Sequence, residues 1–281
     1  MAADLRRIIS KARQSSLTVF QAPIFQSEPP QVSSYNRDMN ICIYRDAEAA
    51  NAAATECLAN WLKHSSTRNL MVAGGNTPLE LYRRIAERRL RLSHLNVFAL
   101  DEYVGVPLDE PRNCANLLRR SVVEAWGIPS AQFFAVSSLA QDARASVREH
   151  ERRIANAGGL DVIVLGLGQN GHLGFNEPGS AADSDGRVLD LAPSSIKANR
   201  KWFGGQYAPA QGATVGLKTI LAARHVLVMA YGPHKAAAVR EMIQGPRSAA
   251  CPASFLQGHP ESHVYVDEAA AAQLDRQHGN K

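Results

Sequence analysis

The sequence predicts a three-layer α/β fold, in which a mostly parallel, doubly wound sheet carries helices on both faces. Two observations lead to this prediction. Short apolar runs rich in β-branched residues recur without polar alternation, as expected for strands covered on both faces. Segments of helical length, with apolar residues at i, i+3 and i+4, separate these runs. Such alternation requires right-handed crossovers between parallel strands.

The expected elements follow one another from residue 39 onward. Strands are expected at residues 41–44, 70–73, 96–100, 162–165 and 226–230. Helices are expected at residues 47–62, 79–90, 115–125, 143–156 and 235–243. Because ligands of such sheets bind at the carboxyl ends of the strands, a functional site is expected in the loops that follow them.

The charge of the chain favours small-molecule chemistry. The 281 residues carry a formal net charge of +5, but residues 1–37 hold five basic groups against two acidic ones, so the rest carries only +2. A nucleic-acid binder usually shows a dense stripe of Lys and Arg on its folded domain. We therefore expect no nucleic-acid partner, and the 45% of hydrophobic residues indicates a globular chain with a sizeable core.

Membrane and metal chemistry are not expected either. No run approaches the roughly 18 apolar residues that a membrane helix needs. The cysteines at positions 42, 57, 114 and 251 form no CxxC pair and have no histidine at zinc-finger spacing. We expect reduced thiols in a cytoplasmic compartment, with no membrane partner and no metal.

Residues 1–37 are expected to form an N-terminal extension, and residues 38–281 a single domain. Ser, Gln and Pro are frequent in the extension, and residues 5–14 could form a short basic amphipathic helix. A transit peptide has a similar composition, but Asp4 and Glu28 interrupt this one. The alternative is an extension that packs on the fold or on a neighbouring subunit.

The first candidate loop contains Gly74, Gly75, Asn76 and Thr77, and lies between an expected strand and an expected helix. Glycines let the backbone approach a ligand closely, and the free N–H groups of a helix start favour an anion such as phosphate. The loop matches neither the P-loop nor the dinucleotide fingerprint, so no nucleotide is implied. The alternative is a plain strand-to-helix turn.

Two adjacent acids, Asp101 and Glu102, follow the strand expected at residues 96–100. Adjacent side chains at a strand end point to opposite sides, so at most one of them would face a given pocket. A carboxylate beside a bound sugar can move a proton between neighbouring carbons. The alternative is a helix cap with a surface salt bridge.

The stretch 166–179 follows the next expected strand and has five glycines in 14 residues. Glycine at this density is expected where backbone bends tightly or touches a ligand. His172 is the side chain best suited to move protons near neutral pH, and Glu177 could orient it or share the proton. A histidine within this glycine density is more typical of a functional site than of a structural one.

Three downstream cations, Arg187, Lys201 and Lys235, are candidate phosphate ligands, although single cations are more often solvated surface charges. Lys235 is the strongest candidate because it follows Gly-Pro-His at a strand-to-helix junction. His259 has no obvious partner in the sequence and is interpreted as structural.

Together these motifs resemble glucosamine-6-phosphate deaminases. The resemblance spans roughly residues 39–268 and rests on Gly-Gly-Asn-Thr-Pro at 74–78, Leu-Asp-Glu-Tyr-Val-Gly at 100–105, and Gly-His-Leu-Gly-Phe-Asn-Glu-Pro within 166–179. These deaminases share a superfamily and a Rossmann-like fold with 6-phosphogluconolactonases. The lactonases typically have a Thr-Ala-Ser-Leu-Phe type of sequence after Gly-His, so Phe-Asn-Glu-Pro favours the deaminase.

The resemblance implies conversion of D-glucosamine 6-phosphate to D-fructose 6-phosphate and ammonia. Asp101 would move a proton from C2 to C1, and His172, supported by Glu177, would open the sugar ring. The phosphate would sit against residues 74–77, Arg187 and Lys235. No cofactor is expected, because general acids and bases and a phosphate anchor suffice.

Two departures from the family pattern concern the site. Asn170 stands where many members have Asp; it can hydrogen-bond and orient the imidazole but cannot stabilise the cation as a carboxylate would. Leu189 and Lys201 stand where Lys and Arg are expected.

Alternatives to glucosamine-6-phosphate deaminase remain open. Asn170 and the Pro-Ala-Ser-Phe-Leu-Gln-Gly-His block also suit a galactosamine-6-phosphate deaminase. A 6-phosphogluconolactonase with His172 as its base, and a sugar-phosphate sensor without catalysis, are further candidates. Relatives range from monomers to hexamers, so a homo-oligomer is possible.

Overall fold

The computed structural model describes residues 31–32 and 39–275, so the helix expected at residues 5–14 lies outside the described residues. The strands are β1 (Gln31–Val32), β2 (Met39–Tyr44), β3 (Asn69–Val72), β4 (Asn96–Ala99), β5 (Asp101–Tyr103), β6 (Phe133–Phe134), β7 (Val162–Gly166), β8 (Arg187–Asp190), β9 (Gln211–Thr214), β10 (His225–Ala230) and β11 (Ser262–Asp267). The helices are α2 (Ala47–Lys63), α3 (Leu79–Glu87), α4 (Cys114–Leu118), α5 (Ala140–Asn156), α6 (Pro193–Trp202), α7 (Leu217–Leu221) and α8 (Ala236–Gln244). In this part of the chain, no helix combines the length and apolar character needed to cross a membrane.

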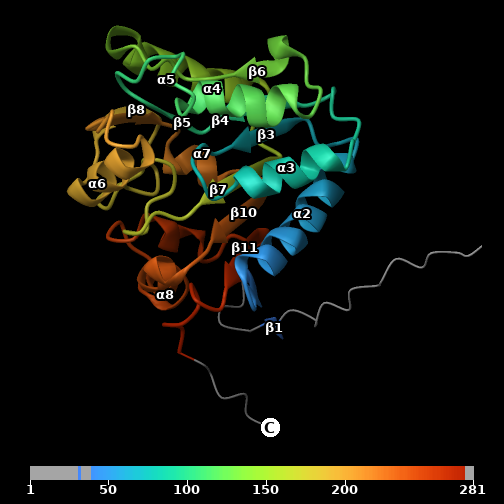
Figure 1. Ribbon diagram of the computed structural model, residues 1–281, viewed down its shortest axis with the longest axis vertical. Helices are drawn as coiled ribbons and strands as arrows, with labels where there is room; N and C mark the ends of the chain where they lie inside the picture. The colour runs from blue at the N-terminus through green and yellow to red at the C-terminus, as the bar shows by residue number, and fades with distance from the viewer. Residues whose placement is uncertain (1–30, 33–38, 276–281) are drawn as a thin grey trace, which may run out of the picture.

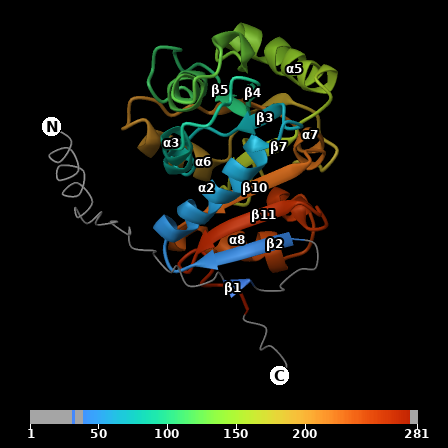
Figure 2. The same cartoon turned by 90° about the vertical axis from the view of Figure 1, so that its right-hand side faces the viewer.

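The main sheet has eight strands in the order β1-β2-β11-β10-β7-β3-β4-β6. All neighbouring pairs are parallel except β1 and β2. Figures 1 and 2 show this order, with the strands stacked from β1 at the bottom of Figure 2 to β4 near the top. The predicted doubly wound, mostly parallel sheet is confirmed.

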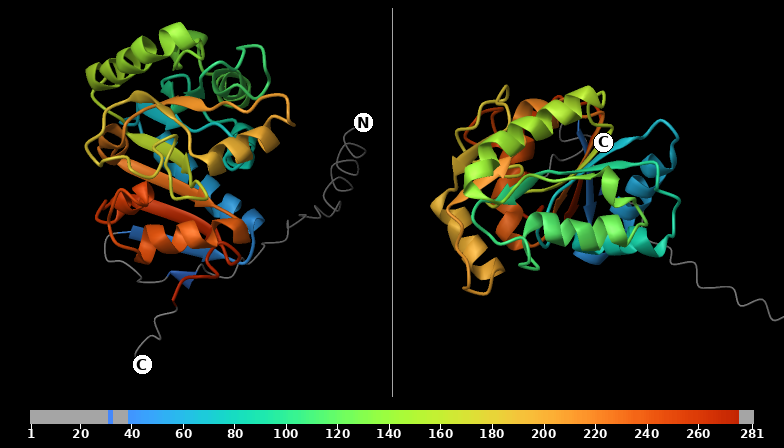
Figure 3. Two further views of the ribbon diagram at one scale, coloured as in Figure 1. Left: turned by 90° about the vertical axis from the view of Figure 1, so that its left-hand side faces the viewer. Right: turned by 90° about the horizontal axis from the view of Figure 1, so that it is seen from above.

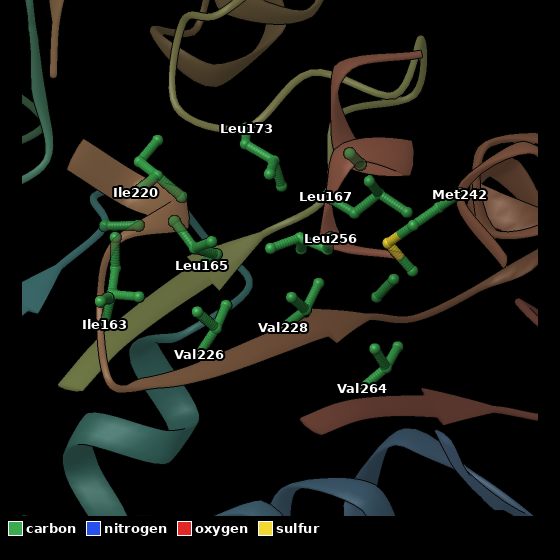
Figure 4. Packing of buried hydrophobic residues seen from close by; sticks show 14 of the residues in the cluster. Ile163, Leu165, Leu167, Leu173, Ile220, Val226, Val228, Met242, Leu256 and Val264 are labelled. Atoms are coloured by element: carbon green, nitrogen blue, oxygen red, sulfur yellow. The ribbon is translucent and has the colours of Figure 1, made fainter. Parts of the chain in front are cut away.

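Helices cover both faces of this sheet, because alternate side chains of each strand point to opposite faces. Val162 and Val164 of β7 pack in a cluster with α2, α3 and the segment after α4. Ile163 and Leu165 pack on the other side, with α7 and α8. The left panel of Figure 3 shows α8, in orange-red, across the lower strands on that side. In Figure 4, Val226, Val228 and Met242 fill the same space.

All five expected strands and all five expected helices exist, with shifted ends. The expected helix at 115–125 is an α-helix only to Leu118 and continues as a π-helical turn over Arg119–Glu124. Lys235 lies in a 3-10 turn, Pro233–Lys235, that precedes α8. The helix expected at 79–90 ends at Glu87, and Arg89 follows with a φ of 48°.

A second sheet was not predicted from the sequence. It is antiparallel, with the order β5-β9-β8, and begins where the chain leaves β4. In its register Asp101 pairs with Thr214, and Thr214 pairs with Arg187. Figure 1 shows β5, β8 and α6 together beside the main sheet. Because the sheet starts at Asp101, it determines how this acid is presented to the carboxyl edge of the main sheet.

Candidate active site

A cavity of about 160 Å³ lies at the carboxyl ends of four strands of the main sheet. The loop at residues 73–78 follows β3, Leu100 and Asp101 follow β4, and residues 166–168 with His172 end and follow β7. Lys235 comes from the turn after β10. The four strands, β10, β7, β3 and β4, are consecutive in the sheet, which is why segments far apart in sequence meet here.

Gly74, Gly75, Asn76 and Thr77 form one wall of the cavity. Gly75 has a φ of 89°, a conformation that favours glycine. Behind this wall the fully buried Tyr82 donates a hydrogen bond from its hydroxyl to the carbonyl of Ala73, over 2.9 Å. No side chain caps the start of α3, and Thr77 in particular does not. The N–H of Leu79 donates to the carbonyl of Asn76 over 3.4 Å, and the rest of this uncapped helix start favours an anion.

Asp101 and Glu102 point to opposite sides, as predicted. Asp101 lines the cavity, whereas Glu102 accepts hydrogen bonds from the backbone N–H groups of Cys114 and Ala115, over 3.1 and 2.9 Å. Glu102 thus caps the start of α4. A helix cap was the alternative role that the sequence left open for one of the two acids. Both carboxylates are almost completely buried, at 7% and 1% exposure.

The two acids also affect each other's titration. Burial, followed by the charge of Glu102, raises the pKa of Asp101 to about 7. Burial also raises the pKa of Glu102, but its backbone hydrogen bonds favour the ionised form and oppose that shift. A carboxylate with a pKa near neutrality is a suitable general base, because it is partly ionised and binds a proton well.

His172, Glu177 and Asn170 form a connected group in the glycine-rich loop. Nδ1 of His172 lies 3.2 Å from Oε2 of Glu177, and Asn170 donates to the same oxygen over 2.6 Å. The side-chain oxygen of Asn170 accepts from the backbone N–H of His172, over 3.3 Å. Asn170 therefore contacts the histidine backbone and the glutamate; its contact with the imidazole is indirect.

Glu177 is held as an anion. Burial by itself would raise its pKa, but hydrogen bonds from His172, Ser195 and Asn170, with the charge of His172, lower it to about 2. Its second oxygen accepts from the backbone N–H of Ala192, over 3.3 Å, at the start of α6. Of the group, His172 lines the cavity, whereas Asn170 and Glu177 lie behind it.

The cations predicted to bind phosphate do not all reach the cavity. Lys235 lines it, and its ammonium donates to the carbonyl of Leu167; burial lowers its pKa to about 8. Arg187 is not among the lining residues in the described part of the chain. Its guanidinium donates to Asn176 Oδ1 over 3.0 Å and to Ser180 Oγ over 2.7 Å.

Lys201 lies on the exposed side of α6. Burial, then the charges of Lys235 and Lys201, lower the pKa of His234. Lys201 is not among the residues that line the cavity in the described part of the chain. His259 is structural, as predicted: its Nε2 contacts the carbonyl of Ala223 over 2.9 Å.

Among the lining side chains without a role assigned from the sequence are Tyr103, Cys114 and Phe175, although Tyr103 and Phe175 belong to the motifs quoted above. The rings of Tyr103 and Phe175 lie 4.8 Å apart, and the hydroxyl of Tyr103 donates to Asn199 of α6 over 3.1 Å. Tyr103 and Phe175 reach the cavity wall through their contacts with the second sheet and with α6. No periodicity marked α6, because only Ser195 and Asn199 of its residues are buried.

In the described residues, no group of three or more His, Cys, Asp or Glu side chains is arranged to hold a metal ion. The cavity instead presents a carboxylate, an imidazole, an ammonium and a helix start. A comparison with known families shows which family has a sequence like that of this chain. The family described as glucosamine-6-phosphate isomerases/6-phosphogluconolactonase matches residues 45–265.

The chain belongs to this family.

Within the glucosamine-6-phosphate isomerase/6-phosphogluconolactonase family, the chain is similar to proteins named glucosamine-6-phosphate deaminase. One from Corynebacterium kroppenstedtii is 40% identical over 242 residues, which cover 84% of this chain and 93% of the relative. One from Streptomyces coelicolor is 38% identical, with the same two coverages.

Solved structures give the same family. A monomeric glucosamine-6-phosphate deaminase superposes with a TM-score of 0.80 at 29% identity, covering 83% of this chain and 99% of the other. The 6-phosphogluconolactonase from Trypanosoma cruzi reaches a TM-score of 0.71 at 21% identity, covering 85% of this chain and 98% of the other. The lactonase likeness shows the common fold alone.

Proposed function

We propose that this chain is a glucosamine-6-phosphate deaminase, which converts D-glucosamine 6-phosphate and water to D-fructose 6-phosphate and ammonia. One observation carries the proposal beyond the relatives: Asp101 and His172 face a single cavity that ends in an uncapped helix start and Lys235. Two proton-transfer groups and an anion site are what this reaction needs.

His172 performs the ring opening in this proposal. It takes the proton of the sugar's O1 hydroxyl and returns a proton to the ring oxygen O5, so that the C1–O5 bond breaks and an aldehyde forms. The imidazole is cationic between these transfers, and the Glu177 carboxylate, 3.2 Å from Nδ1, stabilises that cation. Asn170 fixes Glu177 by donating to the same oxygen.

Asp101 performs the isomerisation. It removes the proton from C2 of the open-chain sugar, whose amino group is protonated, and delivers a proton to C1. One proton of the ammonium passes to O1, which leaves a hydroxyl at C1 and a protonated imine at C2. Water adds to C2 and ammonia leaves, giving the ketone of fructose 6-phosphate. The elevated pKa of Asp101 suits this task, because the same carboxyl must accept a proton and then donate it.

The phosphate is anchored at the other end of the cavity. Backbone N–H groups at the start of α3, the wall formed by residues 74–77 and the ammonium of Lys235 provide hydrogen bonds and positive charge. Arg187 stays a predicted phosphate ligand. Its guanidinium donates to Asn176 and Ser180, which leaves further N–H donors for an anion.

The decisive experiment incubates the protein with glucosamine 6-phosphate, galactosamine 6-phosphate and 6-phosphogluconolactone in parallel. We expect release of ammonia and fructose 6-phosphate from the first. Faster ammonia release from the galacto isomer would reassign the substrate. Lactone hydrolysis without any ammonia would overturn the deaminase and leave His172 as the base of a lactonase.

Two further properties are proposed with this function. All four cysteines are free thiols, which supports a reducing, cytoplasmic location. A homo-oligomer stays a prediction, which the molar mass in solution tests; one solved relative is described as monomeric.

Replacing Asn170 by aspartate is expected to change the pH–rate profile more than the KM. The new carboxylate would lie against Oε2 of Glu177, where the amide now donates, and its negative charge favours the imidazolium of His172. The position of the pH–rate profile should therefore change, while the KM stays close to that of wild type. Steady-state kinetics from pH 5 to 10 measure this, and identical profiles for the two proteins would show that position 170 does not tune His172.

A further inference from the structure

Glu151 of α5 is a charged side chain that the chemistry proposed above does not use. Its Oε2 accepts a hydrogen bond from the backbone N–H of Gly186 over 2.5 Å, and its Oε1 accepts from the N–H of Gly216 over 2.9 Å. The hydroxyl of Thr219 also donates to Oε1, over 3.0 Å. A single carboxylate therefore holds two segments that are distant from each other along the chain.

These two segments are the ends of one excursion of the chain. Residues 187–214, the excursion, form β8, α6 and β9 before the chain returns to the main sheet. At its base the two ends touch: a Cβ at Gly216 would lie 2.0 Å from the carbonyl oxygen of Ser184. The N–H of Lys218 donates to that same oxygen over 3.2 Å. Backbone contacts and the Glu151 carboxylate thus close the base together.

The excursion supports the wall of the active-site cavity. The N–H of Phe175, a cavity residue, donates to the hydroxyl of Thr214 over 3.2 Å. A Cβ at Gly212 would lie 2.3 Å from the Phe175 ring, so this ring packs directly on β9. Tyr103, a second cavity residue, is paired with Gly212 and donates to Asn199 of α6. A displacement of the excursion would therefore move both rings.

The apolar contact between α5 and the second sheet is small. In the described residues, the hydrophobic cluster that they share has four buried members, Val136, Ala143, Val147 and Ala213. Figure 1 shows α5 beside β8, where this contact lies. Because little apolar surface is buried there, the hydrogen bonds of Glu151 make up a large share of what fixes the excursion on α5.

We propose that Glu151 is a positioning residue for substrate binding: by closing the base of the excursion, it holds the wall formed by Tyr103 and Phe175 in the shape that receives the sugar phosphate. The inference deepens the proposed function and rests on it. Without this restraint the excursion populates displaced arrangements, and the substrate binds only the competent one. The apparent affinity then falls in proportion to the competent fraction, whereas the bound state stays the same.

This role predicts a change of KM without a change of kcat. In Glu151→Gln an NH₂ group replaces one of the two oxygens and cannot accept an N–H donor. In Glu151→Asp the side chain is shorter by one methylene and cannot span both N–H groups. We expect each variant to raise the KM for glucosamine 6-phosphate by about three- to tenfold, with kcat within about twofold of wild type, because saturating substrate restores the competent arrangement. Steady-state ammonia release measures both constants.

Hydrogen exchange measures the restraint itself, without catalysis. Peptides that contain Gly186, Gly216, β8 or β9 should exchange faster in Glu151→Gln than in wild type. Peptides from β3 and β7 should exchange as in wild type, which verifies that the main sheet is intact. Glu151 is partly exposed, at the edge of a second cavity of about 690 Å³, so its replacement by glutamine leaves no hole in a core.

Glu149→Gln is the matched control. Glu149 lies on the same helix and pairs at the surface with Arg152 and Arg153, so this variant loses the same charge without touching the excursion. Its KM and its exchange pattern should equal those of wild type. An equal rise of KM in Glu149→Gln would show that the charge of α5, and not the contact with the two glycines, is responsible, and would contradict the inference.

The remaining outcomes also decide the matter. An unchanged KM in both Glu151 variants would overturn the positioning role and leave the deaminase intact. A lower kcat at constant KM would overturn it too, because a purely structural role reduces the fraction of active enzyme. A raised KM without faster exchange at the two glycines would likewise count against it. Absence of ammonia from wild type would instead overturn the proposed function. If the aspartate variant does not fold, the glutamine variant decides alone.

Discussion

Replacing Asp101 by asparagine is expected to lower kcat for ammonia release by about 10³-fold, with a much smaller change in KM. The amide has nearly the shape of the carboxylate but cannot remove the proton from C2. Asp101 and the anion wall at residues 74–77 belong to different loops of the cavity, so phosphate binding should persist in the variant. Coupled assays for ammonia and fructose 6-phosphate measure both products.

This loss is not expected to result from unfolding. Asp101 and Glu102 are adjacent buried carboxylates, and the charge of Glu102 raises the pKa of Asp101. Removing one charge relieves their repulsion, so the thermal midpoint should not fall.

Glu102→Gln provides the matched comparison for Asp101→Asn. It alters the acid that faces α4 and leaves the one that faces the cavity. We expect turnover within about tenfold of wild type and a lower thermal midpoint, because one cap of α4 is weakened. The assignment of the base to Asp101 would be wrong if the asparagine variant kept full turnover, or if the glutamine variant lost as much.

The second large effect is expected from Gly168→Ala. A Cβ at Gly168 would lie 2.3 to 2.4 Å from three atoms of the His172 ring, including Cγ, so the imidazole must leave its present place. Displacement of the ring breaks its alignment with Glu177 and with the sugar oxygens. A misplacement of about 1 Å can cost about 100-fold in rate, and we expect a loss of kcat of that order.

Gly166→Ala distinguishes this displacement from a general effect of added methyl groups. Its Cβ would meet only Thr77, at 3.7 Å, which is ordinary van der Waals contact. Gly166 ends β7, Gly168 lies two residues further along, and neither has a positive φ. We therefore expect similar thermal midpoints for both variants and a much smaller loss of turnover for Gly166→Ala. Equal losses in the two would contradict the assigned role of Gly168, which is to leave room for the imidazole.

The main sheet was predictable because most of its strands can be recognised from a short stretch of sequence. The apolar runs of β3, β4, β7 and β10 lack polar alternation, since helices cover both of their faces. β11 was missed, although it lies between β2 and β10, because Ser262 and His263 begin it with polar side chains. The short strands of the second sheet contain Gly212, Arg187 and Asp190, which no strand pattern favours.

The sequence by itself determined the fold class and the chemical groups of the candidate site. Glycine density after an apolar run marks places where backbone must bend, and His172 and the acid pair stand at such strand ends. Glycine density and the placement of these side chains at strand ends are local properties, which can be seen within a few residues of the sequence. The resemblance added the choice of Asp101 as the base.

Tertiary structure alone decided what each group touches. Glu102 faces away from the cavity because α4, which begins twelve residues later, brings two N–H groups to its carboxylate. Arg187 is hydrogen-bonded to Asn176 and Ser180, and Cys114 lines the cavity because α4 meets the loop at Gly74. The physical reason is the same in each case: burial and hydrogen-bond partners come from segments that are distant along the chain, and only the folded sheet brings them together.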